Sequence, residues 1–336
     1  MDKWSLRKLH GVLEKALTGD YPDKEDCKYL LNFHEASLEA SLTRAAANEL
    51  IRRKNQNTAI ILGQVGICAS ECEGSCKFCT FGEGHATVAP FRLTQEEIRQ
   101  KVLSFCDKDD LYGLFLMTMH DYDLYYFLDA VKTAQSVINP LTKVWANVGD
   151  SGSPAFREMK KAGIDGIYHV CRLGEGVDTK LNPKDRVKTM EKALDAGLKL
   201  YTCLEPIGPE HTPEELVENM FIGIDLHCTQ HAAMRRTATP GTPLANKGQI
   251  SELRLAQIVA VVALAAYNSP NMTHIGVHEP NQLAYVSGAN IITAETGANP
   301  RDTILETSKN RGMDMAACRK MLLECGFSVY QLQEER

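Results

Sequence analysis

Short apolar segments alternate with longer amphipathic segments along most of this 336-residue chain. The short segments are rich in β-branched and aromatic residues, which favour strands. Eight strands are predicted: Thr58–Val65, Leu114–Met119, Lys143–Val148, Gly166–Cys171, Lys199–Leu204, Ala232–Thr237, Thr273–Val277 and Ala289–Thr293. The amphipathic segments predict helices at Thr94–Cys106, Tyr122–Ser136, Ser153–Ala162, Pro183–Ala196, Thr212–Asp225, Glu252–Tyr267 and Glu279–Ser287. Strands that alternate with helices indicate parallel βαβ units, and eight of them predict an α/β fold of the TIM-type (β/α)8 barrel class.

The segments on either side of the predicted barrel are helical in pattern. Residues 1–55 are expected to form a helical lead-in, residues 56–301 the barrel, and residues 302–336 a helical tail that packs on it. No Pro-, Gly- or Ser-rich linker divides the chain, so we expect one domain.

Composition and charge exclude several classes of function. The net charge of −6 is small and the charges are mixed, unlike the basic surface of a nucleic-acid-binding protein. The N-terminal segment is amphipathic and lacks the apolar core of a signal peptide. The longest apolar stretch, Ile258–Tyr267, is shorter than the roughly 20 residues that cross a bilayer. We therefore expect a cytoplasmic protein with neither nucleic acid nor membrane as partner.

Eleven cysteines, an odd number with uneven spacing, indicate reduced thiols or metal ligands rather than a disulfide framework. Three of them, Cys27, Cys318 and Cys325, lie in helical patterns and are expected to be buried apolar residues.

Three cysteines gather in the segment CEGSCKFCTFGEG, where Cys72, Cys76 and Cys79 have the spacing C-x3-C-x2-C. This segment follows the first predicted strand, where catalytic loops of such barrels lie. A structural zinc site takes four protein ligands, often as two pairs, and no second pair is apparent. Three thiolates instead suit a [4Fe–4S] cluster whose fourth iron stays open. Cys68 is either a spare ligand or, as we favour, a core thiol at the strand end.

With Phe78 directly before its last cysteine, this loop resembles the signature of the radical S-adenosylmethionine (SAM) superfamily. The resemblance implies one [4Fe–4S] cluster on Cys72, Cys76 and Cys79 with SAM bound to the open iron. Reductive cleavage of SAM then gives a 5′-deoxyadenosyl radical, which abstracts hydrogen from a small-molecule substrate; a flavodoxin or ferredoxin-type protein is the expected electron donor. The segments PGTPLANKGQ (240–249) and SGANIIT (287–293) resemble the biotin synthase-like branch.

The resemblance also suggests which residues bind SAM. Arg172 and Glu175 follow the fourth strand, and a guanidinium fork suits the SAM carboxylate; the alternative is a surface ion pair. Ile207 follows the fifth strand, at a place where relatives contact the adenine of SAM. After strand two, the superfamily has a Gly-Gly-Glu-like stretch that contacts the amino group of SAM. This chain has TMHD there, and Asp121 is the candidate for that contact. Phe78 completes the predicted cofactor-binding set.

Polar residues after the later strands are candidates for substrate binding: Glu205, Arg235, Arg236, His278, Glu279 and Asn281. Because side chains alternate along a strand, one of the two arginines should point into the barrel, and a one-residue register decides which. Glu295, Asn299 and Arg301 are expected at the same rim. An alternative for this last stretch is a capped turn.

The reaction is left open by the sequence. Biotin synthase holds a second, sacrificial cluster, for which this chain offers only Cys171 and Cys203. We therefore expect one cluster, and cofactor or metallocofactor biosynthesis or carbon-skeleton rearrangement as the role. Sulfur insertion of the biotin synthase type is the alternative, and a non-catalytic zinc or electron-transfer protein is a remote one.

Overall fold

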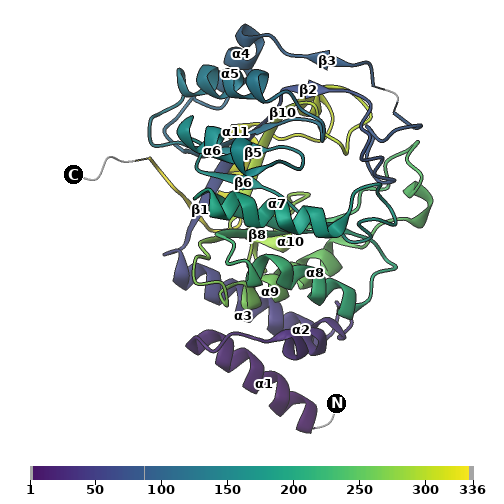
Figure 1. Cartoon of the computed structure of the whole chain (residues 1–336). Coiled ribbons are helices and arrows are strands. Elements are labelled where there is room, and N and C mark those ends of the chain that lie inside the picture. The colour runs from purple at the N-terminus through teal and green to yellow at the C-terminus, as the bar shows by residue number, and fades with distance from the viewer. Residues whose placement is uncertain (1–2, 87, 333–336) are drawn as a thin grey trace.

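The computed structural model describes residues 3–86 and 88–332, and its centre is a closed barrel of eight parallel strands (Figure 1). Strand β1 pairs with both β4 and β10, which closes the sheet. The barrel strands are β1 (Thr58–Gly66), β4 (Leu111–Met117), β5 (Lys143–Asn147), β6 (Gly166–Tyr168), β7 (Lys199–Ile207), β8 (Gln230–Arg235), β9 (His274–His278) and β10 (Ile291–Gly297). The predicted (β/α)8 barrel is confirmed.

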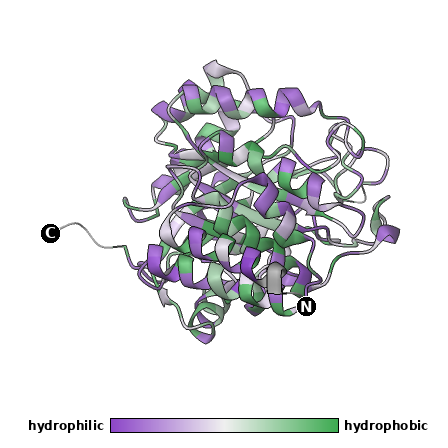
Figure 2. Cartoon of the chain, turned by 90° about the horizontal axis from the view of Figure 1, so that it is seen from below, coloured by the Kyte–Doolittle hydropathy of each residue, from purple (hydrophilic) through white to green (hydrophobic). Residues whose placement is uncertain are grey.

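Helices separate most of these strands and surround the barrel, so that hydrophilic residues lie outside and hydrophobic ones gather in the centre (Figure 2). They are α4 (Gln95–Leu103), α5 (Leu124–Gln135), α6 (Ser153–Lys161), α7 (Pro183–Asp195), α8 (Pro213–Asp225), α9 (Glu252–Ala266) and α10 (Gln282–Tyr285). The starts of α4 and α8 carry capping boxes on Thr94 and Thr212, which satisfy the first free backbone N–H groups. Only α10 is much shorter than predicted.

The predicted helical lead-in consists of α1 (Lys3–Thr18), α2 (Lys24–Leu31) and α3 (Leu38–Lys54). Helix α3 packs on α9, as does α10. Because α9 is covered on its outer side as well as by the barrel, its residues from Leu255 to Ala266 are all buried. This position explains the apolar stretch seen in the sequence. No helix within the described ranges is long and apolar enough to cross a bilayer.

The C-terminal tail combines a helix with an additional strand. Helix α11 (Met315–Glu324) is followed by β11 (Ser328–Val329), which pairs in parallel with the start of β1. A second small sheet joins β2 (Cys68–Ala69) to β3 (Phe91–Arg92) in antiparallel order, and two 3-10 turns lie at Ala245–Lys247 and Thr307–Lys309. These short elements are absent from the sequence-based prediction.

Large and small residues alternate inside the barrel. Trp145 and Tyr201 are fully buried there. They fit because neighbouring positions are glycines: a Cβ on Gly166 would lie 2.4 Å from the Trp145 ring, and one on Gly276 would lie 2.3 Å from the Tyr201 hydroxyl. This apolar packing fills the middle of the barrel and leaves the C-terminal ends of the strands for polar side chains.

Candidate active site

A large cavity opens at the C-terminal end of the barrel, with about 1110 Å³ of empty space, part of it open to solvent. Barrel active sites lie at this end. Of the residues predicted for the site or its rim, ten line the cavity: Cys72, Cys76, Phe78, Cys79, Arg172, Glu205, His278, Glu295, Asn299 and Arg301. Further lining residues include Gln64, His120, Asn147, Tyr168, His169 and Arg186.

Neighbouring loops hold the cysteine loop in place. The backbone N–H of Lys77 donates to the Asp178 carbonyl, and that of Lys180 donates to the Gly74 carbonyl, each at 2.9 Å. The N–H of Leu244 donates to the Lys77 carbonyl at 3.0 Å. The loops after β6 and β8 therefore fix the backbone on which the three cysteines stand.

The three thiols face a common space without forming a site for one ion. Burial raises the pKa of Cys79, and the neighbouring Cys76 and Cys72 raise it further. Burial also raises the pKa of Cys76 to about 11, against the opposing effect of Arg172. Within residues 3–86 and 88–332, no three His, Cys, Asp or Glu side chains converge as a single bound metal ion requires.

This donor set fits a [4Fe–4S] cluster. Thiolates are the usual ligands of such clusters, and three of them on a cavity wall would each hold a different iron. Cys68 does not line the cavity; it lies in β2 and packs partly buried beside Ala69 and Phe81, as expected of a core thiol.

Arg172 stands beside the thiols in a network of buried charges. Its Nε lies 3.4 Å from Oε1 of Glu205, and its backbone N–H donates to the Glu175 carboxylate at 2.9 Å. Burial by itself lowers the pKa of Arg172, but Glu175, Cys76 and Glu205 together raise it above its ordinary value. The guanidinium therefore stays charged at the cavity wall. Glu175 is buried behind it and does not line the cavity.

A second arginine, Arg186 of α7, reaches the same wall. Its Nη1 lies 3.0 Å from Oδ1 of Asp150 and its Nε 3.6 Å from Oε2 of Glu175. Oδ1 of Asp150 also lies within hydrogen-bond distance of Nε2 of His169, at 3.1 Å. Burial lowers the pKa of His169 to about 3, and Arg186 adds to this effect. His169 is therefore neutral at neutral pH, and the positive charges of the network are those of Arg172 and Arg186.

Two ring side chains, Tyr168 and His278, line the floor of the cavity. The Tyr168 hydroxyl donates to Oε2 of Glu205 at 2.5 Å, and the Tyr201 hydroxyl lies 3.3 Å from Nε2 of His278. Burial lowers the pKa of His278 to about 3, and Arg301 lowers it further. The floor therefore offers neutral hydrogen-bonding groups, whereas the side walls carry charges.

Several predicted site residues lie outside the cavity. Asp121 is exposed, because β4 ends at Met117 and the chain has turned to the surface by residue 121. Ile207 is buried in the outer core. Asn281 caps α10 and bonds to the Glu279 carbonyl. Neither Arg235 nor Arg236 lines the cavity.

Both arginines at the end of β8 are paired with carboxylates. Arg236 is buried and forms an ion pair with Glu210, and Arg235 lies 3.4 Å from Glu252 and 3.6 Å from Glu279. The residue of β8 that lines the cavity is Met234. The side-chain alternation therefore turns Met234, rather than either arginine, toward the interior.

The two cysteines considered for a second cluster lie on different sides of the barrel wall. Cys203 belongs to the cluster of side chains inside the barrel, with Trp145 and Tyr201. Cys171 belongs to the outer core between wall and helices, and its thiol contacts the Pro183 carbonyl of α7. Within the described residues these two thiols share no site.

Similar proteins were found by sequence and by structure. The chain is 23% identical over 270 residues to a biotin synthase of Sulfurihydrogenibium sp., which covers 76% of this chain and 78% of that protein. The FeFe-hydrogenase maturase HydG from Carboxydothermus hydrogenoformans superposes with a TM-score of 0.79 at 14% identity, covering 96% of this chain and 79% of HydG. The predicted resemblance to the biotin synthase-like radical SAM enzymes is confirmed.

A third likeness is to another solved structure. Methylornithine synthase (PylB) superposes with a TM-score of 0.75 at 16% identity, covering 95% of this chain and 97% of that one. At such low identity the two solved structures show the shared barrel fold. No protein-family model matches the chain. The similarity to biotin synthase agrees with the prediction that the chain is an enzyme.

Proposed function

We propose that Cys72, Cys76 and Cys79 hold one [4Fe–4S] cluster and that SAM binds at its open iron. When bound, this pair supplies a 5′-deoxyadenosyl radical that takes hydrogen from a small metabolite, with a flavodoxin or ferredoxin-type protein as electron donor. The observation that carries the proposal is that three thiols and the Arg172 guanidinium line one cavity at the C-terminal end of the barrel.

The residues around Arg172 are proposed to bind and orient SAM. A planar guanidinium suits a carboxylate, and Arg172 is held in place by Glu205 and Glu175. Phe78 lines the cavity within the cysteine loop and is a further contact. Asp121 and Ile207, which do not line the cavity, have no part in the proposal.

The remaining cavity wall is proposed to bind the substrate. His278 lies on the floor, and Glu295, Asn299 and Arg301 lie beside it on one wall. Arg301 and Glu295 are 2.8 Å apart, so this wall presents both charges to a bound molecule. We favour a small polar metabolite, and a role in cofactor or metallocofactor biosynthesis or carbon-skeleton rearrangement, because the similar solved structures are a hydrogenase maturase and methylornithine synthase.

Sulfur insertion is the second candidate, because the similar curated proteins are biotin synthases. That reaction draws sulfur from a second cluster. The separation of Cys171 from Cys203 by the barrel wall weighs against it. Iron and sulfide counting of the reconstituted protein separates the two candidates, since clearly more than about four irons per chain would support sulfur insertion.

The test of the proposed cluster is anaerobic reconstitution followed by SAM cleavage with dithionite. Serine at Cys72, Cys76 or Cys79 should abolish iron binding and cleavage, whereas the matched control Cys68→Ser should keep both. A wild-type chain that binds zinc and no iron would support the remote alternative of a zinc protein. A chain that binds the cluster and cleaves no SAM would support an electron-transfer protein instead.

A further inference from the structure

Glu279, which directly follows β9, has a strained backbone. Its φ of 98° lies in the left-handed region, where a residue other than glycine costs about 1–3 kcal/mol. The side chain of Asn281 holds this turn: its Nδ2 donates to the Glu279 carbonyl, and its Oδ1 accepts from Ala284 at the start of α10, both at 2.9 Å. Strain of this kind persists where the surrounding structure requires the side chain in one place.

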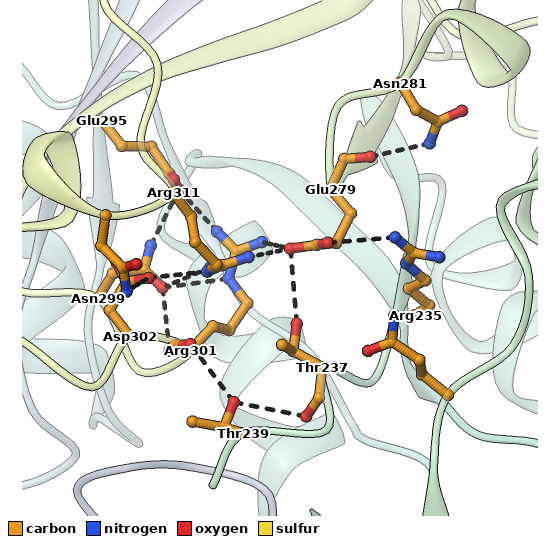
Figure 3. Close-up of polar contacts among 12 residues, drawn as sticks. Arg235, Thr237, Thr239, Glu279, Asn281, Glu295, Asn299, Arg301, Asp302 and Arg311 are labelled. Carbon is orange, nitrogen blue, oxygen red and sulfur yellow. Dashed lines mark hydrogen bonds and ion pairs between the residues drawn. The ribbon is translucent and has the colours of Figure 1, made fainter.

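The Glu279 carboxylate is shared by three arginines (Figure 3). Arg235 and Arg301 each lie 3.6 Å from it, and Arg311 donates a hydrogen bond to Oε1. The Thr237 hydroxyl donates to the same oxygen at 3.5 Å. The carboxylate is surrounded by these four groups and does not line the cavity, so it is not placed to bind a substrate there.

The donors come from two parts of the chain. Arg235 ends β8 and Thr237 follows it, whereas Arg301 and Arg311 belong to the segment 299–313 after β10. Each arginine has another carboxylate partner: Glu252 for Arg235, Glu295 for Arg301 and Asp302 for Arg311. Glu279 is the partner that they have in common, and it joins the barrel strands to the segment.

The start of the segment 299–313, at Asn299, Pro300 and Arg301, lines one wall of the cavity. Arg301 lines the cavity, and its Nε donates to the Asn299 side chain at 3.1 Å. The neighbouring Pro300 carbonyl accepts the backbone N–H of Thr80 at 3.0 Å, one residue after Cys79. The position of this segment therefore affects both the cavity wall and the cysteine loop.

We propose that Glu279 is a positioning residue. Its carboxylate fixes Arg301 on the cavity wall and, through Arg311, holds segment 299–313 over the barrel mouth, rather than binding the substrate as the sequence predicts. This inference rests on the proposed function, because the cavity that it shapes is the one assigned to the cluster and SAM.

Two variants separate the charge from the strained backbone. Glu279→Gln keeps the shape and loses the charge, and Glu279→Gly removes the side chain but relieves the left-handed strain. In both, tryptic cleavage after the exposed Lys309 should accelerate about 10-fold, because charge-assisted hydrogen bonds are lost. Removal of iron from the anaerobic holoenzyme by bathophenanthroline disulfonate should accelerate by a similar factor, with wild-type iron content at the start.

The matched control is Glu252→Gln, which removes the other carboxylate of Arg235 and should leave both rates unchanged. Wild-type rates in Glu279→Gln, or in Glu279→Gly, would overturn the inference. Faster proteolysis without faster iron removal would overturn it too, since the segment would be anchored without guarding the cavity. A wild-type chain that binds no iron overturns the proposed function, and the proteolysis rates then decide on Glu279 alone.

Discussion

The Nε atom of Arg172 lies 3.4 Å from Oε1 of Glu205, and both side chains line the cavity into which the three thiols of the cysteine loop face. Glu205 is only 5% exposed and the Arg172 side chain is 22% exposed, so the pair is largely buried. Removing one partner of a buried pair leaves the other charge uncompensated. Arg172 therefore cannot be replaced without effects on both binding and stability.

Substitution of Arg172 should weaken SAM binding in a graded way. Arg172→Lys keeps the charge and loses the planar fork, so we expect the KM for SAM to rise about 10-fold in dithionite-driven cleavage at unchanged iron content. Arg172→Ala should raise it about 100-fold and lower the free energy of unfolding by about 3–5 kcal/mol. The exposed Arg157→Ala on α6 is the control. A fall in stability with the KM unchanged would make Arg172 purely structural.

The barrel and the cysteine loop were predictable from sequence because their signals are local. The period of apolar residues marks each strand, and Cys72, Cys76 and Cys79 lie within eight residues. All eight predicted strands overlap those observed. The spacing of this cysteine motif can be recognised without knowledge of distant contacts.

The other site residues depend on where each strand ends. Strand β6 ends at Tyr168, three residues before the predicted end, and nothing in the local pattern indicates that Tyr168 reaches the cavity. Arg186 lies on an amphipathic helix, where an arginine normally faces solvent, yet it is 4% exposed between Asp150 and Glu175. Its role follows only from the tertiary packing of α7 against the wall.

Glycines inside the barrel should not tolerate a methyl group. A Cβ on Gly166 would lie 2.5 Å from the Lys199 carbonyl as well as 2.4 Å from Trp145. Overpacking of this kind typically costs about 1–3 kcal/mol, so Gly166→Ala should lower the unfolding midpoint in urea. Gly11→Ala in α1, where nothing lies within 4 Å, should instead stabilise by up to about 1 kcal/mol. Equal midpoints for the two variants would contradict this packing.

The free energy of unfolding should decrease as the pH is lowered, because several buried histidines are neutral in the folded chain. Burial lowers the pKa of His274 to about 3, and Lys143 adds to this; the unfolded value is about 6.5. Between pH 6 and pH 4, the unfolded chain thus binds a proton that the folded chain does not. Each such histidine, among them His169 and His278, contributes a slope of about 1.4 kcal/mol per pH unit.

Replacement of one histidine should reduce this slope by one proton. His274 lies at the start of β9, away from the cavity, so His274→Gln should leave SAM cleavage unchanged. Urea unfolding at several pH values should show a slope lower by about 1.4 kcal/mol per pH unit. The exposed His10→Gln serves as control. An unchanged slope in His274→Gln would mean that His274 is protonated in the folded chain.

The C-terminal tail should contribute directly to barrel stability, since β11 extends the sheet beside β1. Phe327, just before β11, is 2% exposed, and the guanidinium of Arg52 lies 4.1 Å from its ring centroid. Phe327→Ala removes a large buried ring and should lower the free energy of unfolding by about 3–5 kcal/mol. Leu323→Ala, at a residue 61% exposed, should change it by less than about 0.5 kcal/mol. If both variants unfold at the same urea concentration, the tail is not part of the cooperative unit.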